Sequence, residues 1–287
     1  MNLTEFDVTH PYEATLVSTE RMTPAGSEAE VRHLVLSLPS PDFDYVEGQS
    51  VGVLPPGPHE FGNRNHLRLY SIASPREGEN GKAGTLSICV RRCFSIDDIS
   101  GERYPGKASN FLCDANPGDP IHITGPYGIA FQVPADPSAN LLMIGMGTGI
   151  APFRAFVKHI YRDHGGWKGK VRLFYGAQTG MELLYMNDMK KDLSLYYDEE
   201  SFRAFRALSP RPYYNEPPAL DRVFVENARE IWELLEDPKT YVYFAGLSDS
   251  KEKFDKAMEQ TQGSQRSWQD LRARLVDEQR LSEILYD

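Results

Sequence analysis

The chain of 287 residues carries a formal net charge of −10 at pH 7, and it is 40% hydrophobic and 25% charged. Its length favours two domains, each large enough to bury its own core. The acidic balance argues against nonspecific nucleic-acid binding, because phosphate contacts require a basic surface. No apolar run approaches the ~20 residues that span a bilayer, so we expect no membrane association.

Three cysteines, Cys89, Cys93 and Cys113, form no Cys-x-x-Cys pair. They are too few for a disulfide framework or an iron–sulfur cluster, so any redox chemistry requires a bound organic cofactor, and we expect no metal site. The first residues contain no basic region followed by an apolar stretch. We therefore expect no secretory signal and a cytoplasmic protein.

The first half of the chain predicts a small antiparallel β-barrel. Apolar and polar residues alternate over 12–53, and groups rich in proline and glycine, such as 55–58, separate the runs. Further strands are expected at 67–72, 85–91 and 120–124. No long helical pattern precedes about residue 137.

One predicted barrel strand contains Arg68, Tyr70 and Ser71. The two-residue period of a strand puts Arg68 and Tyr70 on one face, where a guanidinium can neutralise a diphosphate and a phenol ring can stack on a planar heterocycle. Ser71 adds a hydroxyl donor. The alternative is an ordinary barrel strand, with a half-buried tyrosine and an arginine paired at the surface.

Small and hydroxylic residues at 106–112 precede an apolar turn. Backbone N–H groups at the start of a short helix there can hold phosphate oxygens. The compatible alternative is a helix N-cap provided by Ser109 or Asn110.

The stretch 141–156 reads as a buried strand, a glycine turn and a helix start. Gly145, Gly147 and Gly149 follow the apolar run, and Pro152 suits the first helical turn. A helix N-terminus behind a glycine turn favours a nucleotide phosphate. The alternative is a turn without nucleotide, since position 150 is Ile and no third spaced glycine completes the dinucleotide motif.

The second half of the chain predicts a parallel α/β domain. Strands expected at 141–145, 171–176 and 241–246 alternate with helices expected at 152–162, about 183–194, about 225–236 and 250–260. Residues 134–138 form the expected junction. We therefore predict an antiparallel β-barrel domain at 1–136 and an α/β parallel-sheet domain at 137–287.

Taken together, these patterns resemble the plant-type ferredoxin–NADP reductase family. The resemblance covers nearly the whole chain. The matching segments are 45–50, 68–74, 88–92, 109–114, 147–154, the pair Gly246-Leu247, and Tyr286.

The resemblance implies that the barrel binds FAD and that the α/β domain binds NADP. Arg68, Tyr70 and Ser71 would hold the flavin and its diphosphate. Residues implied near the adenosine half and the phosphates are Cys89, Val90, Arg91, Lys107, Ala108 and Ser109. Residues implied along the nicotinamide nucleotide channel are Thr148, Gly149, Pro152, Gly246 and Leu247. Those implied at the adenosine 2′-phosphate are Ser209, Arg211 and Arg222.

The chemistry implied is hydride transfer between nicotinamide and flavin, coupled to single-electron exchange with ferredoxin or flavodoxin. Ser71 would orient or hydrogen-bond the flavin near N5. Tyr286 would be a displaceable ring that gates the nicotinamide. Glu283 is the candidate for the family's carboxylate near the chain end, although it lies three residues before Tyr286 instead of two.

Other departures from the family pattern concern the nucleotide. Ala245 stands where plastid members carry a cysteine, and Pro210 interrupts the Ser-Arg pair. Phe224 replaces a tyrosine, which removes one phenol donor. We therefore expect a weakened preference for NADP, with Arg211 and Arg222 still offsetting the phosphate charge.

Two rival functions remain open. One is an NAD(P)H-dependent flavoprotein reductase component of an oxygenase or similar electron-transfer system. The other is a nucleotide-binding interaction module that has lost catalysis, for which Ala245 and the altered end of the chain are the hints.

Overall fold

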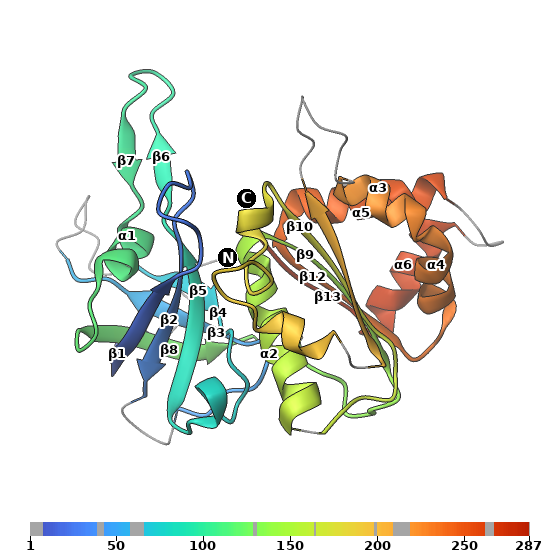
Figure 1. Cartoon of the computed structure of the whole chain (residues 1–287), viewed down its shortest axis with the longest axis horizontal. Helices are drawn as coiled ribbons and strands as arrows, with labels where there is room; N and C mark the ends of the chain where they lie inside the picture. Colours follow the sequence, from blue (N-terminus) through green and yellow to red (C-terminus); the bar gives the residue numbers. More distant parts are fainter. Residues whose placement is uncertain are drawn as a thin grey trace. The chain divides into compact units, whose positions relative to one another are not determined.

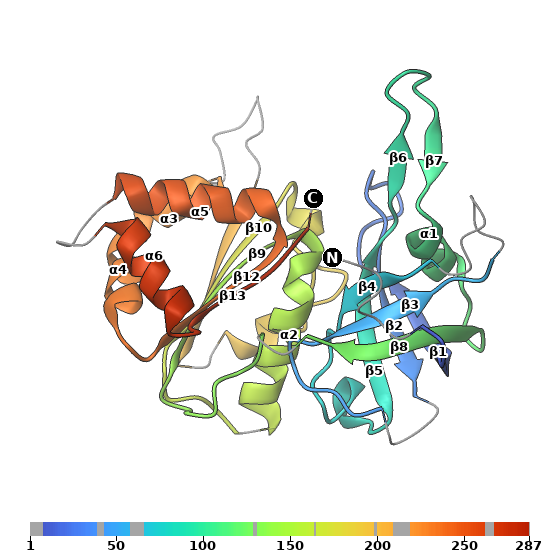
Figure 2. The same ribbon diagram turned by 180° about the vertical axis from the view of Figure 1, so that it is seen from behind.

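The computed structural model describes residues 8–38, 43–57, 66–128, 131–163, 165–197, 200–208, 219–261 and 267–286. The chain divides into two units, Met1–Ile129 and Ala130–Asp287. Figure 1 shows the chain from one side and Figure 2 from behind. The assignment of FAD to 1–136 and of NAD(P) to 137–287 stays a prediction.

The first unit is built on an antiparallel sheet whose six strands, within the described residues, follow the order β4-β3-β8-β1-β2-β5. An isolated bridge between Ile72 and Ile88 joins the two ends of this order, so the sheet closes into a barrel. The bounds are β1 (Tyr12–Arg21), β2 (Val31–Ser37), β3 (Ser50–Leu54), β4 (Arg68–Ser71), β5 (Thr85–Arg91) and β8 (Pro120–Tyr127).

Alternation along the strands fills the barrel. In β1, Ala14 and Leu16 are fully buried while their neighbours Glu13 and Thr15 are exposed. Leu34 and Leu36 of β2 enter the same cluster. Buried and exposed side chains therefore alternate along these strands, as the sequence pattern predicted.

Three further elements lie on the barrel. The helix α1 (Lys107–Asp114) contacts β5, and the short helix η3 (Glu79–Gly81) follows β4. The strands β6 (Phe94–Ile96) and β7 (Arg103–Pro105) pair as a hairpin that extends away from the barrel strands in both views (Figure 1, Figure 2).

The second unit is an α/β domain with a parallel sheet. Within the described residues its strand order is β11-β10-β9-β12-β13. The strands are β9 (Asn140–Met146), β10 (Val171–Ala177), β11 (Phe202–Leu208), β12 (Thr240–Leu247) and β13 (Leu281–Tyr286). The helices are α2 (Ile150–Lys158), α3 (Leu220–Glu226), α4 (Ala228–Glu236), α5 (Ser248–Gln260) and α6 (Trp268–Asp277). Shorter helical pieces are η4 (Gly147–Gly149), η5 (His159–Asp163), η6 (Gly180–Glu182) and η7 (Leu193–Tyr196).

Helices cover both faces of this sheet (Figure 1). Val242 and Phe244 of β12 pack against the cluster that includes residues of α3, α4, α5 and α6. Tyr243 points to the other face, where its ring lies 5.2 Å from that of Phe156 on α2. Among the described residues, no helix combines the length and the apolar character needed to cross a membrane.

The predicted fold class, an antiparallel barrel followed by a parallel α/β domain, is confirmed. The strands expected at 141–145, 171–176 and 241–246 are present. The helix expected at 183–194 is wrong: Tyr185 has φ +61°, and the side chain of Asn187 accepts hydrogen bonds from the amides of Met189 and Lys190. Such side-chain bonds compete with helical ones.

A buried ion pair fixes this irregular segment to α2. Arg154 is fully buried, and its Nε donates to Asp192 Oδ2 over 2.7 Å. Lys158 Nζ lies 3.8 Å from the same oxygen. Burial alone would raise the pKa of Asp192, but the charges of Arg154 and Lys158 outweigh it and lower this pKa.

Replacing Asp192 by Ala should therefore lower the free energy of unfolding by about 3 kcal/mol, because it leaves a buried guanidinium without its carboxylate. Chemical denaturation at neutral pH measures the change. The lowered pKa means that this stabilisation exists above the ordinary carboxyl pKa of about 4 and is lost as the pH falls through the folded value.

The matched control is Asp188→Ala, which removes a highly exposed partner of Lys191 and should change stability by less than about 0.5 kcal/mol. Equal effects of the two substitutions would contradict the anchoring role of Asp192.

Candidate nucleotide and flavin site

The end of β4 presents the three barrel residues predicted to hold flavin. Arg68 is exposed, and its guanidinium donates to the carbonyl of Leu67. Tyr70 is half-buried against the barrel core, and Ser71 lies opposite Ser50 of β3. Arg68 and Tyr70 share a face of the strand, as predicted.

Tyr70 has a sheltered environment near α1. Burial raises the pKa of its phenol, and the neighbouring thiols of Cys93 and Cys113 raise it further. The phenol is therefore protonated at physiological pH and offers a neutral ring and a hydroxyl donor. A neutral ring of this kind suits stacking on a planar heterocycle.

The N-terminus of α1 lies beside the end of β5. Ser109 Oγ accepts from the amide of Cys93 over 3.1 Å, and the side-chain amide of Asn110 donates to the carbonyls of Gly106 and Cys93. The N-cap residue is Gly106, so the expectation that Ser109 or Asn110 caps the helix is wrong. These two side chains instead fix the helix start, where Lys107 and Ala108 contribute backbone N–H groups.

The three β5 residues implied near the adenosine half differ in exposure. Cys89 and Val90 are buried in the barrel, whereas Arg91 is exposed.

In the second unit, a glycine turn joins β9 to α2. Gly147 has φ +56°, and a Cβ placed on Gly149 would lie 2.1 Å from the carbonyl oxygen of Ala245. Only a residue without a side chain fits there. Pro152 is buried in the first turn of α2, where its missing N–H costs little.

A second glycine turn follows β12. Gly246 has φ +112°, and a Cβ on it would lie 2.4 Å from the carbonyl oxygen of Met146. Leu247 then precedes α5 as its N-cap residue. The two turns therefore touch backbone to backbone.

This contact lies where the order of the sheet reverses. From β9 the chain moves to β10 and β11 on one side, and β12 then pairs on the other side of β9. Ligands of open α/β sheets bind at the carboxyl ends of the strands beside such a reversal. Thr148, Gly149 and Gly246 all lie there.

Tyr286 meets Thr148 at the same edge. The register of β12 with β13 places Tyr286 opposite Leu247. The Tyr286 hydroxyl and Thr148 Oγ1 lie 2.5 Å apart, and Tyr286 is 41% exposed. Two candidates 138 residues apart in the sequence are thus brought together.

Glu283 lies apart from Tyr286. The two residues are on opposite faces of β13, because they are an odd number of positions apart. Glu283 instead pairs with Lys251 of α5 over 3.1 Å and with Arg272 of α6 over 3.4 Å.

The candidates for the 2′-phosphate are only partly described. Ser209 and Arg211 lie outside the described residues, directly after β11 ends at Leu208. Arg222 is on α3, where its Nε donates to Glu226 Oε1 over 2.8 Å. Phe224 is buried and packs on Phe254, so it offers no polar group.

One supporting residue was missed by the sequence reasoning. Tyr175, near the end of β10, donates its hydroxyl to the carbonyl of Gly147 over 2.7 Å. Its bond orients the glycine turn. An aromatic residue with a polar tip at the carboxyl end of a buried strand is the signal that points to it.

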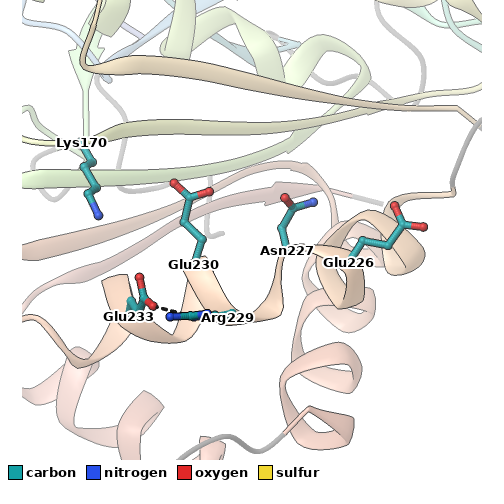
Figure 3. Close-up of a pocket in the computed structure, with 6 residues that line it drawn as sticks. All are labelled: Lys170, Glu226, Asn227, Arg229, Glu230 and Glu233. Atoms are coloured by element: carbon teal, nitrogen blue, oxygen red, sulfur yellow. Dashed lines mark hydrogen bonds and ion pairs between the residues drawn. The ribbon is translucent and has the colours of Figure 1, made fainter.

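A surface pocket of the second unit lies between Lys170, next to the start of β10, and residues of α3 and α4 (Figure 3). Lys170 precedes the start of β10, so the pocket is remote from the glycine turns. Two ion pairs involve residues of this pocket: Arg229 with Glu233, and Glu230 with Arg172. The full lining is Lys170, Glu226, Asn227, Arg229, Glu230 and Glu233. None of the predicted site residues lines it.

Comparisons with known proteins agree with this architecture. Residues 143–256 match the oxidoreductase NAD-binding domain family. A solved ferredoxin–NADP+ reductase from Plasmodium falciparum superposes with a TM-score of 0.74 at 22% identity, covering 100% of this chain and 99% of that one. At this identity the likeness concerns the fold.

Closer relatives exist at the sequence level. A ferredoxin–NADP reductase of Synechocystis sp. is 36% identical over 86% of this chain, and the match covers 60% of the length of that protein. The chloroplastic leaf isozyme 1 of Arabidopsis thaliana is 38% identical over 88% of this chain and 71% of its own length. The Spirulina sp. enzyme is 35% identical over 88% of this chain and 87% of its own length. The resemblance predicted from the motifs is confirmed: the chain belongs to the ferredoxin–NADP reductase family.

Proposed function

We propose that the chain is an FAD-dependent oxidoreductase that transfers electrons between NADP(H) and a one-electron carrier protein, ferredoxin or flavodoxin. The observation that carries the proposal is the pair of touching glycine turns with Tyr286 hydrogen-bonded to Thr148. This arrangement occurs in a chain whose relatives are named ferredoxin–NADP reductases.

The barrel residues fit an FAD. Arg68 is an exposed cation suited to a diphosphate, Tyr70 offers a neutral ring, and the start of α1 presents backbone N–H groups. When bound, FAD supplies hydride exchange with nicotinamide and single-electron exchange with a carrier. Ser71 donates a hydrogen bond that orients the flavin near N5.

Further contacts complete the proposed flavin site. They run along β5 and the start of α1, and they hold the adenosine half and the phosphates. The residues are Cys89, Val90, Arg91, Lys107, Ala108 and Ser109.

The glycine turns fit a nicotinamide nucleotide. The absence of side chains at Gly149 and Gly246 lets the two turns pack closely together, and Thr148, which is partly exposed, offers a hydroxyl beside them. Pro152 and Leu247 line the same edge. Ser209, Arg211 and Arg222 bind the adenosine 2′-phosphate, for which guanidinium groups are the preferred partners.

Tyr286 gates the nicotinamide in this proposal. Its hydroxyl bonds to Thr148, so a nucleotide that uses Thr148 must displace it.

A flavoprotein reductase component with another electron acceptor is the second candidate. Two observations favour it: Ala245 provides no thiol, and Phe224 is committed to the core. The first concerns the nicotinamide, and the second removes a phenol donor for the 2′-phosphate and so weakens the preference for NADP. Assays with ferredoxin and with a panel of oxygenase components distinguish the two functions.

We place the protein in the cytoplasm. None of its three cysteines forms a disulfide, which fits a reducing compartment. Localisation of the tagged full chain tests the assignment, and a chloroplast location, as in the Arabidopsis relative, would overturn it.

The function is tested first with the purified protein after addition of FAD. We expect a yellow protein whose visible absorption is bleached by NADPH and restored by oxidised ferredoxin with stoichiometric ferredoxin reduction. A protein that stays colourless would favour the rival interaction module.

Replacing Arg222 by Ala should lower the ratio of kcat/KM for NADPH over NADH about tenfold, the effect of one lost charge-assisted bond. The Arg222–Glu226 pair is exposed, so little holds Arg222 away from a phosphate. Arg229→Ala removes an equivalent pair with Glu233 on α4 and should leave the ratio unchanged. Equal ratios in both variants would rule out the role of Arg222.

Arg211→Ala should likewise lower this selectivity, because it removes the second positive charge expected at the 2′-phosphate. The same kinetic comparison measures it. An unchanged ratio would mean that Arg211 is not at the phosphate.

Replacing Tyr286 by Ser should strengthen binding of NADP+ about tenfold, because the nucleotide no longer displaces a ring bound at Thr148. Titration followed by difference absorption measures the affinity. Affinity equal to that of the wild type would show that Tyr286 does not compete for the turn.

A further inference from the structure

The strand β13 has two chemically different faces at the edge of the nucleotide site. Tyr286 points toward Thr148, whereas Leu281, Glu283 and Leu285 belong to the other set of alternate positions. Leu281 and Leu285 pack against the cluster that contains residues of α5 and α6. Glu283 therefore faces the helices and not the glycine turns.

Glu283 joins three elements through ion pairs. Both of its oxygens lie 3.1 Å from Lys251 Nζ of α5, and Arg272 of α6 reaches Oε1 over 3.4 Å. The side chains of Glu283, Lys251 and Arg272 are 28%, 21% and 37% exposed, so water screens these pairs only in part. Asp255, bound to the Trp268 indole, adds a second carboxylate to this cluster.

The position of β13 makes this cluster important for Tyr286. Within the described residues β13 pairs with β12 alone and stands at the end of the strand order. An edge strand has backbone partners on one side only, and its last residues fray most easily. Tyr286 is the last residue of β13, so its approach to Thr148 depends on what holds the strand.

We propose that Glu283 is a positioning residue: with Lys251 and Arg272 it clamps β13 to α5 and α6, and so keeps the Tyr286 hydroxyl on Thr148. The proposal rests on the proposed function to the extent that Tyr286 competes with the nucleotide. It assigns Glu283 a task on the face away from the reacting groups, in place of the catalytic role expected from its sequence position.

The clamp predicts that loss of Glu283 raises the affinity for NADP+, which a purely catalytic carboxylate does not predict. Loosening β13 lowers the occupancy of Thr148 by Tyr286, so NADP+ should bind more tightly. Glu283→Gln and Lys251→Met should each strengthen NADP+ binding about threefold, within the range of partly exposed ion pairs. The double variant should show little more than either single variant, because both remove one interaction.

The experiment uses the full chain loaded with FAD and measures NADP+ affinity by difference absorption. Glu283→Gln should have no effect in a chain that also carries Tyr286→Ser, because the ring that the clamp positions is gone. Lys251→Arg keeps the charge and should retain wild-type affinity. Lys253→Met is the matched control, since Lys253 pairs with Asp249 on the same helix away from β13.

A second measurement does not depend on nucleotide. Hydrogen exchange at the amides of 284–286 should quicken in Glu283→Gln and in Lys251→Met and stay at the wild-type rate in Lys253→Met. Unchanged exchange in the first two variants overturns the clamp even if the protein binds neither FAD nor NADP+. A wild-type protein that fails to bind these ligands overturns the proposed function instead.

Kinetics separate the two roles of Glu283. A clamp changes KM for NADPH and leaves kcat for reduction of an artificial acceptor within about twofold, because the interaction it alters precedes the chemical step. A large loss of kcat in Glu283→Gln that Lys251→Met does not reproduce contradicts the clamp and supports a carboxylate that acts on the reacting groups.

Discussion

The backbone contact between the turns after β9 and β12 is the constraint on which the candidate site depends. A methyl group on Gly149 would overlap the carbonyl of Ala245, and one on Gly246 would overlap the carbonyl of Met146. Each turn thus excludes side chains from the other. The result is a close contact of the two turns at the sheet reversal with the partly exposed Thr148 beside it, and ligands of open α/β sheets bind next to such a reversal.

The contact also determines which side chains from neighbouring strands lie next to the turns. Because β12 is held against β9, its partner β13 ends next to the glycine turn, and the register delivers Tyr286 to Thr148. From the other side of β9, β10 delivers the Tyr175 hydroxyl to Gly147. Two phenols from the strands that flank the β9–β12 region therefore support one short turn.

Local patterns in the sequence predicted the parts of the fold that depend on local forces. Apolar runs identified β9, β10 and β12, and glycine spacing identified the turn at 147–149. Neither pattern could predict the bond between Thr148 and Tyr286, because a contact between residues so distant in the sequence arises from strand order. The segment 183–194 has helical composition, yet Asn187 and the buried Arg154–Asp192 pair fix it in another conformation. Tertiary contacts override helix propensity there.

The position of Glu283 in the sequence is not enough to assign it the role of the family's carboxylate, because strand geometry decides which way its side chain points. A carboxylate near the end of the chain resembles the family pattern, but a shift of one residue along a strand moves the side chain to the opposite face. Ile284 lies on the face of Tyr286, and Glu283 meets Lys251 and Arg272. The same chemical group is thus placed for electrostatic support of β13. At the carboxyl ends of β9 and β12, the described polar groups are therefore backbone groups and the hydroxyls of Thr148 and Tyr286. A nucleotide that binds there must displace Tyr286, so the ligand is selected by its ability to do so.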